Sequence, residues 1–327
     1  MKGMSLSNRQ HRSMRFQNLS RKEYFEGWYY KQVTPDENTV ISFIPGLSVR
    51  GGKTSPFIQV NLAQRTGETW QQTSDWLNFS LLDAQDEPFF IQLGGNCFRR
   101  EGIDIAYQGE KLQVKGRLAF RETVALPRSN WAPTIMGPFS CLPGMECIHS
   151  VISLSHTIEG SLTVNGSLVD FTRGKGYIEK DWGSSFPRRY VWLQSNHFAD
   201  EGSLFFSWAE IPVAGMSFKG YIAHLYYRGE HHRFATYTRG KCMIKAGEHK
   251  AEIVLTKGGS TLRITAAQSA GSELIAPYRG EMVHTIKEGL YGQLSFCLTQ
   301  SNPHRVLCDK TELAGVELVL GKGAQQA

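Results

Sequence analysis

The sequence predicts an all-β protein made of antiparallel strands. From Val40 onward, apolar residues recur at every second position, and Gly, Asn or Pro interrupts these runs about every eight to twelve residues. Apolar residues at helical spacing are nearly absent, and the chain contains 33 glycines, which suit tight turns between short strands. These observations favour β-barrels or β-sandwiches over an α/β fold.

The chain length predicts two structural units. A chain of 327 residues exceeds the size at which single hydrophobic cores stop growing, roughly 250–300 residues. With 41% hydrophobic and 20% charged residues, the chain can bury a large core. We expect a basic N-terminal tail at 1–20, an N-terminal β-barrel unit at 21–145 and a C-terminal β-barrel unit at 146–327. The Pro-rich segment 126–144 would form the crossover between the units.

Three hairpins are predicted from their turn residues. The Asn-Gly pair at 165–166 lies between alternating apolar residues and suits a type I′ turn, which would pair Leu162 with Val169. Two further hairpins are expected at 103–120 and 251–265, because glycines interrupt both alternating runs near their middle. All three would join strands that are neighbours in sequence, as antiparallel sheets allow.

The excess of positive charge is concentrated near the N-terminus. The formal net charge is +6. Much of it comes from Arg9, Arg12, Arg15, Arg21 and Lys22. The sequence has neither a nucleic-acid-binding module nor a long basic stripe with aromatic residues, which argues against a nucleic-acid partner. A solvated tail is the simplest interpretation, and attraction to an anionic membrane surface, worth about 1 kcal/mol per basic residue, is the alternative.

The sequence also predicts the cellular compartment. The N-terminus lacks the apolar core of a secretory signal, and no run approaches the roughly 18 apolar residues of a membrane-spanning helix. We therefore expect a cytoplasmic protein, with peripheral membrane contact as the alternative. The six cysteines show no C-x-x-C pair and no disulfide-scaffold spacing. We expect them to be reduced thiols, most of them buried.

Familiar catalytic and metal-binding motifs are missing or incomplete. The segment 47–54 is similar to a phosphate-binding loop, but it lacks the first glycine and continues into a strand pattern where a helix N-terminus is required. No G-x-S-x-G or H-E-x-x-H motif occurs. His149 and His156 are seven residues apart, which in an unbroken strand places them on opposite faces. We therefore expect no metal site.

A short stretch near the middle of the chain contains the strongest candidate for acid chemistry. Strand alternation would place Tyr177, Glu179 and Asp181 on one face, and Lys180 and Trp182 on the other. Two like charges this close raise the pKa of one carboxyl group, and burial raises it further, which keeps a carboxyl group protonated as an acid. Glu179 and Asp181 are therefore the candidate catalytic residues. A surface pair of carboxylates beside a turn is the structural alternative.

The following stretch supplies a candidate ligand-binding face. Tyr190, Trp192, Gln194 and Asn196 occupy alternate positions, so one strand face carries two aromatic rings and two amides. Inside a barrel, such a face resembles a ligand pocket, in which apolar walls supply burial and a few polar groups orient the ligand. An amide ladder between neighbouring strands is the structural alternative.

With these residues in view, the chain resembles the tocopherol cyclase family. The resemblance rests on Y-F-E-G-W-Y-Y-K at 24–31, and on 177–198, which contains E-K-x-W-G-x-x-F-P followed by W-x-Q-x-N. Looser matches lie at 276–277 and 291–292. The resemblance implies two lipocalin-like antiparallel β-barrel units packed together.

The resemblance also implies acid-catalysed ring closure of a prenylated hydroquinone, without a cofactor. An isoprenoid alkene is protonated, and the phenol oxygen captures the tertiary cation to give a chromanol. Glu179 ranks above Asp181 as proton donor, because plant members of the family favour Asn at the latter position. Together with the two strand faces, the resemblance gives these candidate substrate-binding residues: Tyr177, Trp182, Phe186, Tyr190, Trp192, Gln194, Asn196, Glu26 and Trp28.

These candidates have different expected roles. Trp182 and Trp192 could stabilise the cation through their ring faces. Gln194 and Asn196 could orient the quinol oxygens. For the two N-terminal residues of the set, a structural role at the end of a barrel is the alternative.

Three functions fit the sequence. The first is an isomerase that cyclises a prenylated phenol or a related isoprenoid. The second is a lipocalin-like carrier that binds such a ligand unchanged, and the third is a hydratase that adds water to an isoprenoid alkene. The expected partner is in each case a hydrophobic small molecule. An exposed Glu179, or one salt-bridged to a basic residue away from any cavity, would count against the acid hypothesis.

Overall fold

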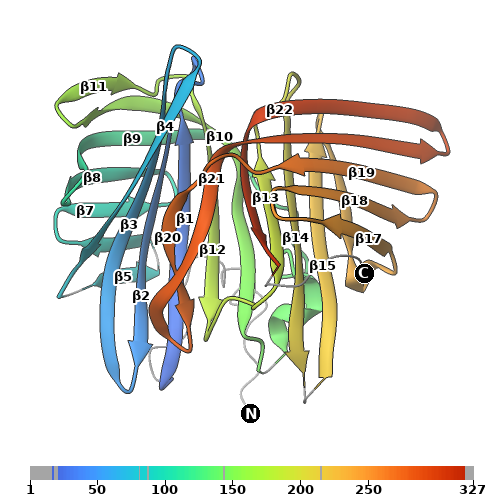
Figure 1. Cartoon of the computed structure of the whole chain (residues 1–327), viewed down its shortest axis with the longest axis horizontal. Coiled ribbons are helices and arrows are strands. Elements are labelled where there is room, and N and C mark those ends of the chain that lie inside the picture. The colour runs from blue at the N-terminus through green and yellow to red at the C-terminus, as the bar shows by residue number, and fades with distance from the viewer. Residues whose placement is uncertain are drawn as a thin grey trace. The chain divides into compact units, whose positions relative to one another are not determined.

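The protein is almost entirely β-sheet in the computed structural model, which describes residues 17, 21–80, 82–86, 88–142, 144–213 and 216–320. Its strands form two antiparallel sheets (Figure 1). The all-β prediction is therefore confirmed. Most of the predicted basic tail lies outside the described residues. Within them, no helix is both long and apolar enough to cross a membrane.

The chain divides into two compact units, and both are discontinuous in sequence. Unit 1 comprises Met1–Phe186 and Ser272–Thr285, and unit 2 comprises Pro187–Gly271 and Ile286–Ala327. The sequence did not predict that the late segment Ser272–Thr285 packs with the N-terminal part of the chain.

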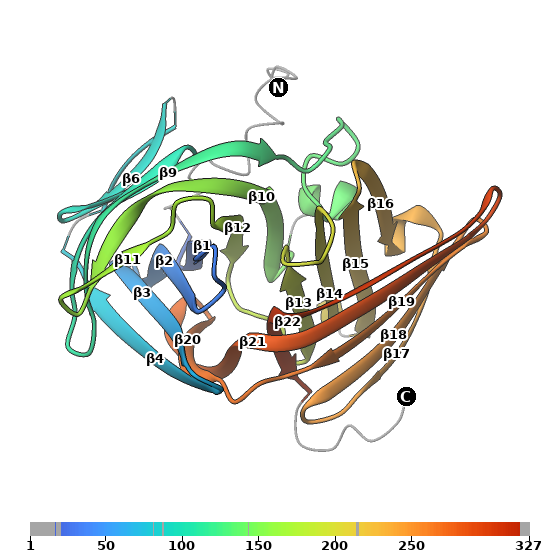
Figure 2. The same cartoon turned by 90° about the horizontal axis from the view of Figure 1, so that it is seen from above.

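The sheet of unit 1 has the strand order β4-β3-β2-β1-β12-β10-β9-β8-β7-β6-β5, and β11 pairs with β10. The strands are β1 (Glu23–Val33), β2 (Thr39–Arg50), β3 (Lys53–Thr66), β4 (Thr69–Asn78), β5 (Asp83–Asp86), β6 (Phe89–Leu93), β7 (Asn96–Arg99), β8 (Gly102–Gln108), β9 (Gln113–Val124), β10 (Cys147–Val164), β11 (Ser167–Asp170) and β12 (Lys175–Gly183). Figure 2 shows the strong curvature of this sheet, from β4 through β1 and β10 to β9.

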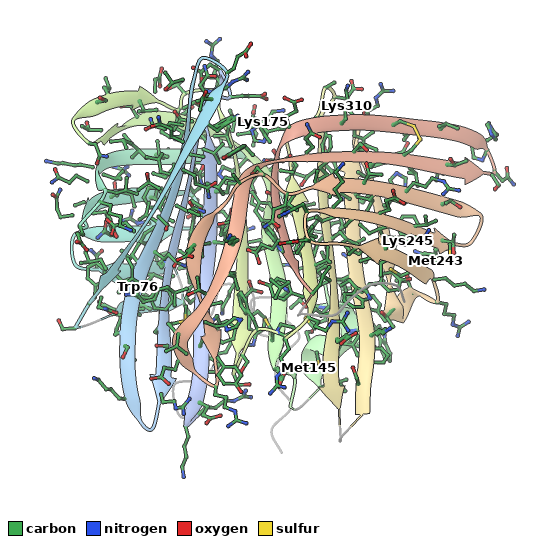
Figure 3. The ribbon with its side chains drawn as sticks, viewed as in Figure 1. Trp76, Met145, Lys175, Met243, Lys245 and Lys310 are labelled. Carbon is green, nitrogen blue, oxygen red and sulfur yellow. A yellow bond between two sulfur atoms is a disulfide. The ribbon has the colours of Figure 1, made fainter. Side chains whose placement is uncertain are left out.

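The second sheet, most of which belongs to unit 2, has the order β16-β15-β14-β13-β22-β21-β19-β18-β17, and β20, which belongs to unit 1, pairs with β21. The strands are β13 (Tyr190–Ser195), β14 (Gly202–Val213), β15 (Met216–Tyr227), β16 (Glu230–Ala235), β17 (Lys241–Ala246), β18 (Lys250–Lys257), β19 (Ser260–Ala267), β20 (Ser272–Tyr278), β21 (Glu281–Ser301) and β22 (His304–Val319). Alternation is clear on β17, where Met243 and Lys245 are exposed (Figure 3) while Cys242 and Ile244 pack against the core.

The prediction that each unit forms a closed barrel is wrong. Among the described residues, β4 and β5 remain at the two edges of the first sheet, and β16 and β17 at the edges of the second. Closure would require these edge strands to pair with each other. Alternation in the sequence fixes which side chains face the core but carries no information on whether the two edges meet.

The three predicted hairpins are confirmed. Asn165 and Gly166 both have positive φ (47° and 84°), as a type I′ turn requires, and Leu162 pairs with Val169. The hairpin at 103–120 is formed by β8 and β9, and that at 251–265 by β18 and β19.

Each unit has its own apolar core. In unit 1, residues such as Trp28, Tyr30 and Ile178 are buried together with side chains from β2, β3 and β6–β10. In unit 2, Val191 and Leu193 of β13 are buried with side chains from β14, β15, β18, β19, β21 and β22. Burial of this much apolar surface is the main force that stabilises each unit.

A late hairpin completes unit 1. Residues 272–285 turn at Arg279 and Gly280, and the N–H of Gly280 donates to the carbonyl of Ser184 (2.7 Å). A side chain at 280 would lie 2.3 Å from the backbone of Tyr24, so this close approach requires glycine. The hairpin also bonds to β3 through Gln59, whose amide oxygen accepts from the N–H of Ile275 (2.7 Å).

The expectation that all six cysteines are free thiols is wrong for one pair. Cys297 and Cys308 form a disulfide, seen as a yellow bond in Figure 3. They lie directly opposite each other on β21 and β22. The physical reason is this strand register, which cysteine spacing alone does not reveal. The other four cysteines are free.

Candidate functional site

The candidate acid residues lie on β12, at the centre of the unit 1 sheet between β1 and β10. Glu26 of β1 is opposite Trp182 of β12, and Trp28 is opposite Lys180. Because directly opposed residues share a face, these four side chains lie on one side of the sheet. It is the same side as Ile178, which is part of the apolar core. We call this side the core face of β12.

The core face contains a fully buried ion pair. The ammonium of Lys180 contacts the carboxylate of Glu26, and both side chains are completely buried. Lys180 Nζ also lies 4.7 Å from the ring centre of Trp28 and 4.8 Å from that of Trp182, within cation–π range. Burial lowers the pKa of Lys180, and the neighbouring Glu26 opposes this shift.

Further hydrogen bonds satisfy the Glu26 carboxylate. The Tyr24 hydroxyl donates to Oε2 (2.7 Å), and the backbone N–H of Gln17 lies 3.1 and 3.2 Å from the two oxygens. A buried carboxylate with this many donors is well compensated for its lost hydration. Glu26, Trp28 and Trp182 therefore meet in one cluster around Lys180. Their role in binding a substrate stays a prediction, as does the structural alternative for the first two.

The opposite side of β12, which we call the acid face, carries Tyr177, Glu179 and Asp181. Tyr177 is completely buried, and 4% of Glu179 is exposed. The Tyr177 hydroxyl donates to Glu179 Oε2 (2.7 Å). Burial raises the pKa of Tyr177 well above its usual value, and the charge of Glu179 raises it further, so the hydroxyl keeps its proton. Glu179 is thus buried beside a hydrogen-bond donor.

Asp181 has a different neighbour on the same face. It lies opposite His149 of β10, and a carboxylate oxygen of Asp181 contacts His149 Nδ1. Cys147, two residues before His149, has its thiol near both groups. Burial raises the pKa of Cys147 well above its usual value, and nearby carboxylates raise it further, Asp181 the most. His156, by contrast, contacts Gln32 on the core side of the sheet.

The predicted ligand-binding face of unit 2 does not line the interior of a barrel. Val191 and Leu193 of β13 belong to the apolar core, so Tyr190, Trp192 and Gln194 point to the other side of the sheet. These three residues are nevertheless buried, as is Asn196, which follows the strand. Their role in binding a substrate stays a prediction.

Two contacts position the aromatic residues of this face. The Tyr190 hydroxyl donates to Glu317 Oε2 on β22 (2.6 Å). The indole ring of Trp192 lies against Gly315 of β22. A Cβ at this position would be only 2.6 Å from the ring, so the close contact requires glycine. The bond from Tyr190 to Glu317 in unit 2 therefore has the same chemistry as the bond from Tyr177 to Glu179 in unit 1.

The predicted residues of unit 1 therefore fall into three groups. Glu26, Trp28 and Trp182 meet on the core face, and Tyr177, Glu179 and Asp181 meet on the acid face. Phe186 lies beyond the end of β12, where its ring packs against Phe25 (5.4 Å between ring centres) and its N–H donates to the Pro277 carbonyl (3.1 Å).

The sequence interpretation missed Cys147 and His149 as members of the acid face. Their i, i+2 spacing on a strand was a usable signal, but their register opposite Asp181 could not be read from the sequence. The glutamate bonded to Tyr190 was also missed, because Glu317 is remote in sequence and no motif marks it.

The acid face is equipped for proton transfer. It holds a carboxyl group with a bonded hydroxyl, and next to them a histidine–carboxylate pair. Carboxyl, imidazole and hydroxyl groups are the usual general acids and bases of enzymes. Burial strengthens their electrostatic effects because little water screens them.

Comparison with solved structures shows the fold. CghA matches with a TM-score of 0.59 and 10% identity, over 93% of this chain and 90% of that one. Kievitone hydratase from Nectria haematococca matches with 0.53 and 11%, over 93% and 91%. A putative AttH protein from Nitrosomonas europaea matches with 0.52 and 14%, over 90% and 92%. At these identities the likeness concerns the fold alone.

Comparison with protein families identifies the sequence more specifically. No curated protein matches the chain significantly. The family described as tocopherol cyclase-like matches residues 113–320, a stretch that begins at β9 and contains the acid face and all of β13. This match spans well over half of the chain. The protein therefore belongs to the tocopherol cyclase-like family.

Proposed function

We propose that this protein is an isomerase that closes a ring in a prenylated hydroquinone or a related isoprenoid, with Glu179 as the proton donor. The observation that carries the proposal is the buried pair of Tyr177 and Glu179, 2.7 Å apart, within the part of the chain that matches the family. Burial and a bonded hydroxyl are what an acid needs when its substrate is an alkene that water would otherwise intercept.

The proposed reaction conserves all atoms. The protonated carboxyl group of Glu179 transfers its proton to one alkene carbon, which leaves a tertiary cation on the other. The phenol oxygen bonds to that cation and gives up its proton to the Glu179 carboxylate, which restores the acid. Tyr177 donates a hydrogen bond to this carboxylate and stabilises it between the two transfers.

The geometry favours Glu179 over Asp181 as the acid. The Asp181 carboxylate is already in contact with His149, a basic group, whereas the hydroxyl beside Glu179 keeps its own proton. Trp182 is on the opposite face of β12 and pairs with Lys180, so in this proposal it does not stabilise the substrate cation.

The test is to incubate the purified protein with a prenylated hydroquinone in deuterated water and to follow the product by mass spectrometry and NMR. We expect a cyclised isomer with one carbon-bound deuterium. Glu179→Gln should slow its formation by roughly 10²–10⁴-fold, the usual contribution of a general acid. Glu110→Gln, at an exposed turn of the same unit, is the matched control and should leave the rate unchanged.

Other outcomes separate the remaining functions. A product that has gained one molecule of deuterated water would identify a hydratase, an activity that the name of one structural neighbour, kievitone hydratase, also carries. Tight binding with no product would identify a carrier and overturn the catalytic proposal. Full activity of Glu179→Gln would remove Glu179 from the mechanism. The ligand class and a cytoplasmic location, with or without membrane contact, remain part of this proposal.

A further inference from the structure

The acid face carries three groups that the proposed proton transfer does not use. Cys147 Sγ, a ring nitrogen of His149 and a carboxylate oxygen of Asp181 all lie within 4.8 Å of one another. They are held by two adjacent strands, since Cys147 and His149 are two residues apart on β10 and His149 is directly opposite Asp181 on β12. The register between β10 and β12 is regular from 147 to 151, which fixes all three on one face.

We infer that Cys147, His149 and Asp181 form a binding site for a divalent transition metal ion of the zinc type. A thiolate, an imidazole and a carboxylate are the three side-chain ligands that zinc prefers. Metal bonds of about 2.0–2.3 Å at tetrahedral angles separate ligand atoms by roughly 3.3–3.8 Å. A bound ion would therefore draw the Cys147 thiol closer and move His149 Nδ1 and the Asp181 carboxylate, which are in direct contact, slightly apart. Three protein ligands leave a fourth position open.

The surroundings of the cluster suit a cation. The carboxylate of Asp181 supplies negative charge directly at the cluster, where it contacts His149. A divalent ion would neutralise this charge. Gly183 is directly opposite Cys147 and has no side chain to cover the thiol.

The site has a chemical signature that an ordinary ion pair lacks. A metal ion bound at this site would form a bond to the Cys147 thiolate, and binding through a thiol ligand releases a proton to solvent. A hydrogen-bonded His149–Asp181 pair without metal affinity would show neither proton release nor a metal–thiolate bond.

The test is a cobalt titration of the full-length protein after removal of metals with a chelator. We expect one Co²⁺ per chain, with a thiolate-to-cobalt charge-transfer absorption that an equal amount of Zn²⁺ abolishes. Cys147→Ser should remove this absorption, while Cys141→Ser, at an exposed free thiol in the same unit, should retain it. His149→Gln and Asp181→Asn should weaken binding at least about tenfold.

Measurements on the unmodified chain guard against variants that fail to fold. Zn²⁺ should slow alkylation of Cys147 but not of Cys242, the free thiol of unit 2, as read by peptide mass spectrometry. It should also raise the Tm of the wild type and of Cys141→Ser, but not of Cys147→Ser. Absence of a thiolate–cobalt absorption in the wild type, or its persistence in Cys147→Ser, would overturn the inference. Neither result depends on whether the protein cyclises an isoprenoid.

Discussion

The two faces of β12 differ in how their charged side chains are partnered. On the core face, Lys180 and Glu26 form a buried ion pair, the ammonium lies near two indole rings, and the Tyr24 hydroxyl also donates to the carboxylate. On the acid face, Glu179 and Asp181 stand beside a hydroxyl, a thiol and one histidine. Consecutive residues of one strand thus belong to a buried ion-pair cluster and to a cluster of carboxyl, hydroxyl, thiol and imidazole groups.

This difference separates stability from chemistry along a single strand. A buried charge whose partner is lost has no water to replace that partner, so damage to the core face should appear as unfolding. The acid face contains a hydroxyl–carboxyl hydrogen bond and an imidazole–carboxylate contact. Because the proposed chemistry uses this face, damage there should appear first as lost activity.

The largest effect should come from breaking the ion pair. Lys180→Met leaves the Glu26 carboxylate buried without its partner and should lower the free energy of unfolding by about 3–5 kcal/mol. The double variant Lys180→Met/Glu26→Gln removes both charges and should recover much of that loss. Urea denaturation measures all three proteins. Equal stabilities of the single and double variants would contradict the explanation that the unpaired buried carboxylate causes the loss.

A smaller loss should follow from filling space on the core side. A Cβ at Gly176 would lie 2.1 Å from His156 Nε2 and 2.3 Å from Gln32 Oε1. Gly176→Ala should therefore cost toward the upper end of roughly 1–3 kcal/mol, the usual range for overpacking. At Gly27, opposite Asp181, a Cβ would meet nothing closer than 3.8 Å. Gly27→Ala is the matched control, and a comparable loss there would contradict the steric explanation.

The pH dependence of stability should also report on the core side. Burial lowers the pKa of His156 to about 3, while an unfolded histidine titrates near 6.5. Below about pH 6.5 the unfolded chain therefore binds a proton that the folded chain does not. The free energy of unfolding keeps its full value above that pH and decreases as the pH falls toward 3. The expected loss is about 2 kcal/mol between pH 7 and pH 5.

His156→Gln tests this assignment because it cannot titrate. The free energy of unfolding, measured by urea denaturation at pH 7 and pH 5, should change less in the variant than in the wild type by that amount. An unchanged pH dependence would assign the acid sensitivity to other groups.

The smallest stability effect should come from the acid face. Tyr177→Phe removes one hydrogen bond to a buried carboxylate and should cost about 1–1.5 kcal/mol. Tyr190→Phe removes the equivalent bond to Glu317 in unit 2 and should cost a similar amount. Thermal denaturation compares the two. Under the proposed mechanism, cyclisation should slow about tenfold in Tyr177→Phe, and a fully active variant would exclude its hydroxyl.

Local features of the fold were predictable because strand alternation and turn chemistry act over a few residues. The separation of Tyr177 and Glu179 from Lys180 and Trp182 follows from alternation alone, and the structure shows it. The positive φ values at the Asn165 turn follow from its Asn-Gly sequence.

Features that depend on strand order and register were not predictable. The partner of Lys180 is on β1, and only the pairing of β1 with β12 brings Glu26 to it. The same holds for Cys147 and His149 beside Asp181. Alternation also could not show which face of β13 meets the core, because Val191 and Leu193 are apolar while Tyr190 and Trp192 are aromatic, and either pair could be buried.

The late hairpin of unit 1 bears on the order in which the protein is made. Residues 272–285 are integral to unit 1 although they follow most of unit 2 in the chain. As the chain leaves the ribosome, β1 and β12 can pair early, but the place beside Tyr24 and Ser184 stays vacant until Gly280 emerges. The N-terminal unit is therefore finished only after residues 187–271 of unit 2 have been synthesised, and a fragment ending at Phe186 would expose the surface that the hairpin covers.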